Sequence, residues 1–444
     1  MPTVELSMIV KNEEATLERC LSSVREAVDQ IVIADTGSTD ATIDIAHRFG
    51  AKVVKIPWES DFSKARNLAL QHATCDWVLV LDADEMLDDT GRAGMTTLLN
   101  QQDVLGYDVW IWNYVRTLTS REWNRPAIRN PNRIDVARRY PAYVEHRNVR
   151  LFRRHPQIYF EGQVHEGVAD RMKSLAMKVV EAPFVIHHLG MAEEDQQTYK
   201  RKMEFYRKLG MEKLRQTPND CRAHFELGML ELESFRNPAS ALPYFKRTIE
   251  LMNHSAVAWT FSGICLVRLG RLREGLDCLK QAEQLGARDG VHLEAEGDAH
   301  YHLEEFAEGK RCYEAAGRAG NCSAVLESKL GVCEVRLGAV DKGLRRIESA
   351  ILSEPDMPEL FDILAAAALW SGHLDMAANT AERRLSIGNP KPNSFLIAAA
   401  IRAQLGQWQN ALEIAEAGCR CFPQDNQLRS ARVEADRSFR KNTE

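Results

Sequence analysis

The sequence has no Cys-x-x-Cys pair among its ten cysteines and no basic segment leading into a long apolar stretch near residue 1. The scattered cysteines lack the spacing of a zinc site and the density of a disulfide framework. No apolar run approaches the ~20 residues that a membrane-spanning helix needs. We expect a cytoplasmic protein with reduced cysteines, no export signal and no membrane span.

Extreme composition is absent as well. Hydrophobic residues make up 45% and charged residues 27% of the 444 residues, with 26 Gly and 15 Pro. These values exclude collagenous, low-complexity and mainly disordered chains. The chain exceeds one ordinary domain of about 150 residues, so the sequence predicts two or three units with buried cores.

Excess positive charge is absent from the whole chain but present in one segment. The formal net charge is −6, which argues against a nucleic-acid partner because binding to phosphate needs cations. Residues 116–154, however, hold eleven Arg against three acidic residues. We expect this segment either to assist an anionic ligand or to form a solvated loop whose arginines pair with carboxylates elsewhere. Its aromatic residues form no recognisable base-stacking motif.

Up to about residue 190, short β-branched runs alternate with helical patterns. Strands are expected at 4–10, 30–34, 51–56 and 76–81, with helices at 13–28, 39–49 and 62–72. This alternation predicts an α/β domain with parallel strands. Further strands are expected at 107–115, 149–152 and 158–160.

From about residue 192 onward the pattern is helical and has a fixed period. Small residues recur at spacings of 34 or 35, and a second small-residue series follows each of them twelve or thirteen residues later. The first series is Gly228, Gly263, Gly297, Gly331, Ala365 and Ala399, and the second is Ala241, Gly275, Gly309, Gly343, Ala377 and Ala411. Small residues let paired helices approach closely, as helix–turn–helix repeats require.

The pattern resembles the tetratricopeptide repeat, with six units, although Cys265, His300 and Ala365 depart from its usual residues. An ordinary helical bundle is the alternative. The expected organisation is a catalytic domain at 1–195, a connecting helix at 196–221, helical repeats at 222–425 and a C-terminal tail at 426–444.

Carboxylates follow the most hydrophobic of the expected strands. In an extended chain the i, i+2 spacing puts Asp82 and Asp84 on one side, where both can reach one hard cation or a metal–diphosphate unit. Open α/β sheets bind ligands at this edge. The alternative is that these acids only cap a strand and begin a turn.

Polar residues also follow two other expected strands. Asp35 comes directly after one strand and before a Gly turn, and Asn12 and Glu13 follow Val10. Because the carboxyl ends of parallel strands meet at one edge, we expect these side chains to gather there. Turn and helix-capping chemistry is the alternative for the residues after Asp35.

Four ordered motifs resemble family 2 glycosyltransferases: SMIVKNEE at 7–14, ADTGSTD at 34–40, FSKARN at 62–67 and LDAD at 81–84. The resemblance implies a glycosyltransferase A fold, a Rossmann-like mixed sheet that binds a nucleotide-sugar and generally transfers with inversion. It implies these roles: Val10 and Glu13 beside Asn12 at the nucleoside pocket, Asp35 at the base, Lys64 and Arg66 at base or diphosphate, Asp82 at ribose and metal, and Asp84 at the metal. Mg²⁺ or Mn²⁺ would neutralise the departing diphosphate.

An inverting transfer also needs a base on the acceptor side. Relatives that add sugars to lipopolysaccharide cores or peptides contain a stretch similar to Val164-His165-Glu166, so the resemblance implies Glu166 as base, with His165 beside it. His165 as a structural histidine is the alternative.

Two further assignments remain open. His188 fits the family-like His-x-Gly position better than His187 and would complete the metal coordination, unless both histidines are only hydrogen-bonded at the domain junction. Arg150 or Arg153 would assist diphosphate binding.

The leading hypothesis is a metal-dependent inverting hexosyltransferase that moves a sugar from a UDP-sugar to a peptide or protein side chain, with the repeats binding the acceptor or a second copy of the chain. The domain order looks like that of the bacteriocin peptide S-glycosyltransferases. A lipopolysaccharide-core or other glycan acceptor is one alternative. A non-catalytic repeat scaffold with a degenerate transferase domain is another.

Overall fold

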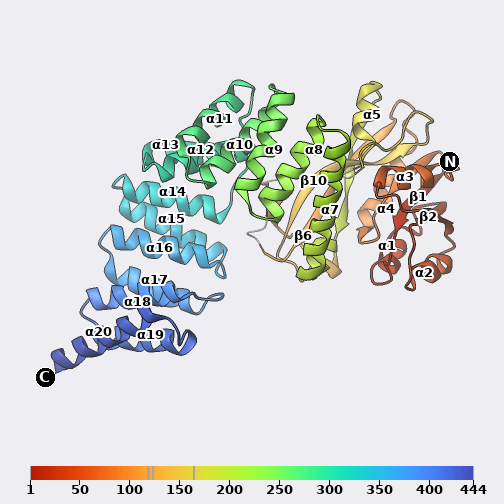
Figure 1. Ribbon diagram of the computed structural model, residues 1–444. Coiled ribbons are helices and arrows are strands. Elements are labelled where there is room, and N and C mark those ends of the chain that lie inside the picture. Colours follow the sequence, from red (N-terminus) through yellow and green to blue (C-terminus); the bar gives the residue numbers. More distant parts are fainter. Residues whose placement is uncertain (1, 118–120, 123–124, 164–165, 444) are drawn as a thin grey trace. The chain divides into compact units, whose positions relative to one another are not determined.

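The computed structural model describes residues 2–117, 121–122, 125–163 and 166–443. The chain divides into two compact units, Met1–Phe235 and Arg236–Glu444 (Figure 1). The expected repeats begin at 222, whereas the second compact unit begins at Arg236. The helix at 221–229 therefore packs with the first unit.

The first unit is built on strands β1 (Val4–Val10), β2 (Gln30–Asp35), β3 (Lys52–Lys55), β4 (Trp77–Val80), β5 (Glu85–Leu87), β6 (Gly106–Val115), β7 (Arg121–Glu122), β8 (Arg125–Pro126), β9 (Ile128–Arg129), β10 (Ala142–Arg153) and β11 (Val179–His188). Its helices are α1 (Leu17–Val24), α2 (Thr42–Arg48), α3 (Phe62–Leu70), α4 (Asp89–Leu98), η1 (Asp135–Ala137), α5 (Ala169–Ser174), α6 (Gly190–Glu193), α7 (Gln196–Gln216), α8 (Cys221–Met229) and η2 (Leu230–Ser234).

The main sheet has the strand order β3-β2-β1-β4-β10-β6-β11-β5, with β9 paired to β10. Strands β1 to β4 run parallel, which confirms the expected α/β domain. Strand β10 is antiparallel to both β4 and β6, so the sheet is mixed. The carboxyl ends of β1, β2 and β4 lie at one edge.

Two apolar layers hold this sheet between helices. On one face, Leu6 and Met8 of β1 pack with Leu17 and Leu21 of α1 in one continuous core. On the other face, Ala34 of β2 packs with helix α3. The alternation of side chains along each strand explains why every second residue joins the same layer.

The strand expected at 158–160 is wrong, because this segment is a loop. The side-chain amide of Asn67 takes the place of a partner strand there. It accepts a hydrogen bond from the Phe160 backbone nitrogen at 2.8 Å and donates one to the Phe160 carbonyl oxygen at 2.9 Å. A single side chain thus satisfies the backbone groups that would otherwise need a strand.

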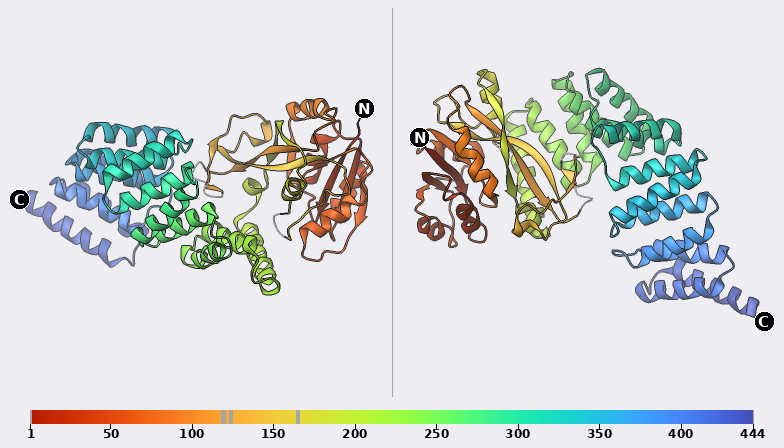
Figure 2. Two further views of the ribbon diagram at one scale, coloured as in Figure 1. Left: turned by 90° about the horizontal axis from the view of Figure 1, so that it is seen from above. Right: turned by 180° about the vertical axis from the view of Figure 1, so that it is seen from behind.

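The second unit consists of helices α9 (Pro238–Leu251), α10 (Ala256–Arg268), α11 (Leu272–Gln284), α12 (Gly290–His302), α13 (Phe306–Arg318), α14 (Ala324–Arg336), α15 (Val340–Ser353), α16 (Pro358–Trp370), α17 (Leu374–Leu385), α18 (Pro392–Gln404), α19 (Trp408–Cys421) and α20 (Asn426–Thr443). Consecutive helices pair from α10 to α19, and the pairs stack in chain order, as the two further views show (Figure 2). The expected repeat solenoid is confirmed.

The small-residue series lie where the paired helices touch. A methyl group added to Gly331 of α14 would meet the Gly343 carbonyl oxygen of α15 at 2.8 Å. The corresponding contact for Gly263 is the Gly275 carbonyl oxygen, at 3.1 Å. The spacing of the small residues in the sequence therefore corresponds to the spacing of the close contacts between the backbones of paired helices.

The last segment, expected as a tail, forms helix α20 and packs on α19 through the buried Leu428. Among the described residues, none of the helices combines the length and apolar character that crossing a membrane requires.

The close contact between α14 and α15 predicts the effect of one methyl group. We expect Gly343→Ala to lower the free energy of unfolding by about 1–3 kcal/mol, because its Cβ would collide with the Gly331 carbonyl oxygen. Gly317→Ala is the matched control, since a Cβ there meets nothing within 4 Å and alanine favours a helix. Urea denaturation followed by circular dichroism compares them, and equal stability of the two variants would contradict the prediction.

Candidate active site

A cleft of about 840 Å³ opens beside the carboxyl end of β4 in the first unit. Strand β4 supplies Val80 and the following Asp82, β10 supplies Arg150, and α3 supplies Arg66. Other lining residues are Asp108, Trp110, Glu145, His146, Arg147, Phe160, Glu161, Glu166, Asp170, Arg222, Phe225 and Glu226. Charged side chains of both signs dominate the wall.

Arg66 joins the two sides of this site. Its Nη2 lies 2.6 Å from Asp82 Oδ1, and its Nε lies 2.5 Å from Glu166 Oε1. The guanidinium side chain is only 7% exposed and also lies over the Phe160 ring. Burial lowers the pKa of Arg66, but the two carboxylates more than reverse this, so it remains charged. The structure thus brings Arg66, Asp82 and Glu166, three of the expected site residues, together.

A second arginine pairs with the other face of Asp82. Arg150 Nη2 lies 2.8 Å from Glu85 Oε1 and 3.4 Å from Asp82 Oδ2. Glu85 is 1% exposed, and burial raises the pKa of Glu85 to about 7. Burial also acts to raise the pKa of Asp82, but the two arginines outweigh this and hold it well below its usual value. Both oxygens of Asp82 are therefore engaged by cations of the protein itself.

Asp84 faces a histidine rather than an arginine. Its Oδ2 lies 3.1 Å from Nε2 of His188, and His188 Nδ1 donates to Asn113 Oδ1 at 2.6 Å. Burial lowers the pKa of His188, but the Asp84 carboxylate outweighs this and raises it to about 9. Gly190 lies so close that an added Cβ would overlap Asp84 Oδ2. Only glycine leaves room for this carboxylate.

The Asp84–His188 pair fits a divalent cation in its donor atoms. A carboxylate oxygen and an imidazole nitrogen face each other, and the Asn113 amide holds the ring with Nε2 toward Asp84. His187, the alternative in the sequence, points elsewhere. Its Nδ1 bonds the Tyr114 hydroxyl at 2.9 Å, and its Nε2 lies 3.4 Å from Asp88.

The residues expected at the nucleoside pocket form a tied loop at the same sheet edge. Asp35 accepts hydrogen bonds from the backbone nitrogens of Gly37 and Ser38 at 3.2 and 3.0 Å. Asn12, with a φ of 57°, accepts one from the Thr39 nitrogen at 2.8 Å. Asparagine tolerates this left-handed conformation better than most residues. Turn hydrogen bonds therefore account for part of the role of Asp35 itself, as well as for the residues that follow it.

Three other residues of the predicted donor site, Val10, Glu13 and Lys64, lie in different surroundings from one another. The Val10 side chain is buried, and the Val10 carbonyl oxygen accepts from the Thr36 backbone nitrogen. Glu13 lies near Asp84, and burial raises the pKa of Glu13. Lys64 is exposed and pairs with Glu59 at 3.0 Å, on the surface of α3.

The Arg-rich segment divides between structure and site. Arg150 lies in the cleft wall, whereas Arg153 lies over the Trp77 ring and donates to the carbonyl oxygens of Val104 and Gln101. His165, named as neighbour of the base, lies outside the described residues.

Sequence reasoning missed three residues of the site. Glu85 stands directly after Asp84 but was given no role, although its position after a buried strand is a signal. Asn113 interrupts the aromatic strand β6 and bridges His146 and His188, with Nδ2 donating to His146 Nδ1 at 3.0 Å. Lys202 of α7 lies near Asp84, and nothing in the sequence indicates this.

Comparison with known proteins defines the class of the first unit. Residues 6–157 match the model of the glycosyl transferase family 2, so this part of the chain is a domain of that family. The mixed sheet is of the glycosyltransferase A type, as expected from the motifs.

Two individual proteins show how far the similarity extends along the chain. The chain is 37% identical over 175 residues to a TPR repeat-containing protein of Synechococcus elongatus, covering 39% of this chain and 38% of the relative. It is 26% identical over 250 residues to the SPbeta prophage-derived glycosyltransferase SunS of Bacillus subtilis, covering 56% of this chain and 53% of SunS. The chain thus spans about two fifths to one half of the length of these relatives.

Solved structures similar to the chain include PilW, a type IV pilus biogenesis factor. It has 17% identity and a TM-score of 0.42, covering 47% of this chain and 97% of that chain. The TPR protein YrrB has 20% identity and a TM-score of 0.33, covering 43% and 97%.

The Arg66 ion pairs predict a strong effect on stability. We expect Arg66→Met to lower the free energy of unfolding by about 3 kcal/mol, because the Glu166 carboxyl group, 12% exposed, would lose its ion-pair partner. Asp82, 38% exposed, would be partly solvated and would keep Arg150, so the loss stays near the lower end of the usual range.

Lys64→Met on the same helix is the matched control, since the Lys64–Glu59 pair is solvent-exposed and should change the melting temperature little. Thermal denaturation of the full chain compares the two variants. An unchanged melting temperature for Arg66→Met would contradict a central role for these ion pairs.

Proposed function

We propose that this protein is a metal-dependent inverting glycosyltransferase that moves a sugar from a UDP-sugar to a side chain of a peptide or protein. The family match over residues 6–157 supports sugar transfer from a nucleotide donor. The observation that carries the proposal is that Asp82 and Glu166 line one cleft and share Arg66, while Asp84, two residues after Asp82, pairs with His188. Retention of these carboxylates argues against a degenerate scaffold.

The donor would bind with its nucleoside end at the loop tied by Asn12 and Asp35, and with its diphosphate toward Asp84. Arg66 and Arg150 would not meet the diphosphate freely, because Asp82, Glu85 and Glu166 already engage them. Their role here is to hold Asp82 in place for the ribose. Lys64, although exposed, is at the start of α3 and would approach the base or diphosphate.

The divalent cation, Mg²⁺ or Mn²⁺, would be held by Asp84 and His188, with Asp82 as a further candidate. When bound, it would neutralise the charge that accumulates on the leaving diphosphate. The protein's own part is to fix these donor atoms: Asn113 orients His188, and Gly190 leaves room for the Asp84 carboxylate.

Glu166 would remove the proton from the attacking acceptor group. Its Oε1 is held by Arg66, so the carboxylate is fixed in direction, and it lines the cleft in which the sugar and the acceptor would meet. A fixed carboxylate loses little orientational freedom when it takes the proton, which favours general-base catalysis.

The acceptor is proposed to be a peptide, because stacked helical repeats offer extended surfaces that suit a chain better than a monosaccharide. A glycan acceptor remains the second candidate, favoured by the Val-His-Glu stretch. A homodimer through the repeats stays a prediction.

Removal of the metal-site carboxylate gives the first test. We expect Asp84→Ala to abolish release of UDP from a UDP-sugar in the presence of Mn²⁺ while the chain remains folded with a moderately lower melting temperature, because Asp84 lies at a strand end and His188 can release its proton when this carboxylate is removed. EDTA should have the same effect on the unmodified protein.

Asp89→Ala, which removes a carboxylate that is 92% exposed on α4, is the control and should keep full activity. Full turnover in EDTA, together with an active Asp84→Ala variant, would overturn the metal assignment. Loss of activity in both variants would indicate an effect on folding, which the melting temperature reports.

Replacement of the base gives the second test. We expect Glu166→Gln to lower the rate of transfer to acceptor by at least ~100-fold with little change in donor affinity, because glutamine keeps the shape but cannot take a proton. Glu161→Gln is the matched control from the same cleft wall. Transfer is followed by mass spectrometry of the acceptor and donor affinity by calorimetry. A Glu166→Gln variant that transfers at nearly the rate of the unmodified protein would exclude Glu166 as base.

A further inference from the structure

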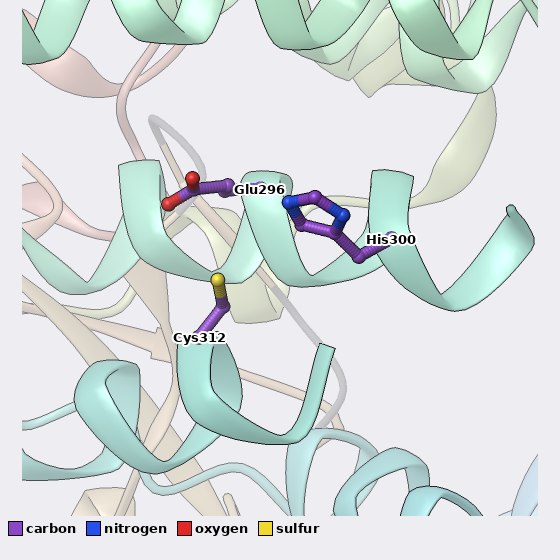
Figure 3. A group of neighbouring side chains, drawn as sticks. All are labelled: Glu296, His300 and Cys312. Carbon is purple, nitrogen blue, oxygen red and sulfur yellow. The ribbon is translucent and has the colours of Figure 1, made fainter. Parts of the chain in front are cut away.

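Three side chains of different chemistry meet between two helices of the second unit, far along the chain from the proposed active site. Glu296 and His300 lie on α12, and Cys312 lies on α13 (Figure 3). One ligand atom from each lies within 4.8 Å of the other two. Cys312 is 4% exposed, and the other two are half-buried.

The sequence explains why these three side chains lie close together. Residues four apart lie on one face of a helix, so Glu296 and His300 point the same way from α12. Gly297 beside them lets α13 come close, because an added Cβ would lie 3.3 Å from the Cys312 Cβ and 2.7 Å from the Tyr313 ring. The small residue of the repeat thus brings the sulfur of Cys312 against the Glu296–His300 face.

The imidazole is held in one orientation by a carboxylate outside the cluster. His300 Nδ1 lies 2.7 Å from Glu305 Oε2, so Nδ1 carries a hydrogen atom and donates a hydrogen bond to this carboxylate. The second ring nitrogen, Nε2, then has its lone pair available, and Figure 3 shows a ring nitrogen facing Glu296. Histidine ligands of metal ions characteristically donate their other N–H to a carboxylate in this way.

We propose that Glu296, His300 and Cys312 bind a zinc ion that links α12 to α13. Thiolate, imidazole and carboxylate are the three ligand types that Zn²⁺ accepts, and soft sulfur excludes Mg²⁺ and Ca²⁺. Zinc bonds to such atoms are about 2.0–2.3 Å long, so the three atoms, which lie within 4.8 Å of one another, would have to move closer together to share one ion. Three protein ligands leave one position for water or another ligand.

Without the ion, the thiol is protonated and donates to Glu296. Burial and this neighbouring carboxylate raise the pKa of Cys312 to about 12. Binding therefore replaces one proton on sulfur by the metal and releases that proton to the solvent. Glu296 changes from hydrogen-bond acceptor to metal ligand in the same step.

The preceding repeat contains the same cysteine without the two other proposed ligands, so a cysteine at this position does not by itself form the cluster. Cys278 of α11 stands 34 residues before Cys312, at the same position of its repeat. The residues that correspond to Glu296 and His300 there are Ser262 and Leu266 of α10. The chain thus contains the same cysteine position with and without the two partner ligands.

Titration of the full-length protein with Co²⁺, a spectroscopic substitute for Zn²⁺, tests the proposal. We expect one equivalent to produce a thiolate-to-cobalt charge-transfer band, and Zn²⁺ to abolish it and to raise the melting temperature. The band distinguishes this site from the proposed Asp84–His188 site, which contains no sulfur. Cys312→Ser and His300→Gln should lose the band, whereas Cys278→Ser should keep it.

Three results would overturn the proposal: no band at one equivalent of Co²⁺, a band that persists in Cys312→Ser, or a band that disappears in Cys278→Ser. Circular dichroism checks that each variant remains helical. If Cys312→Ser fails to fold, His300→Gln alone decides, because its side chain is only partly buried and its loss leaves the sulfur in place.

Glu305 gives a separate test of the positioning of His300. We expect Glu305→Gln to keep the charge-transfer band but to weaken Co²⁺ binding about 10–100-fold, as is usual when a carboxylate behind a histidine ligand is removed. Arg273→Gln is the control, since Arg273 pairs with the same Glu305 but does not contact the imidazole. Unchanged affinity in Glu305→Gln would contradict coordination through Nε2 of His300.

Discussion

One buried guanidinium fixes the geometry of the candidate active site. Arg66 reaches from α3 to Asp82 after β4 and to Glu166, which stands one hundred residues further along the chain. A buried cation must be paired, so none of these segments can shift without leaving a charge unpaired in a poorly solvated place. The relative positions of the proposed ribose ligand and the proposed base are therefore set by one side chain.

Burial and the neighbouring charges together set the pKa values of the acids in this site. Arg66 and Arg150 stand against the carboxylates of Asp82, Glu85 and Glu166. The most deeply buried acid, Glu85, responds with a raised pKa, whereas Asp82 between the two arginines stays ionised. The ionised Asp82 is a fixed anion at this sheet edge, and it would favour a diphosphate that carries a divalent cation.

The sequence predicts the elements better than the contacts between them. The strand ends at Val10 and Asp35 and just before Asp82 follow from local patterns, and the repeat period follows from the small residues, because both depend on residues close in the chain. The pairing of Arg66 with Glu166, and of His188 with Asn113, depends on the strand order β4-β10-β6-β11, which no local pattern records. The loop at 158–160 was misjudged because the Asn67 side chain replaces a strand there.

The position of helix α8 limits where the transferase unit can be joined to a different helical-repeat unit. By sequence period, Gly228 of α8 begins the repeat series, yet Arg222, Phe225 and Glu226 of the same helix line the cleft of the first unit. The boundary of the repeats and the boundary of the catalytic unit are therefore different positions. A chimera joined after Phe235 inherits an intact cleft wall whichever solenoid follows, whereas one joined at the first repeat would lose three side chains of that wall. Recombination between transferases and solenoids is thus constrained by the segment 222–235, which belongs to both.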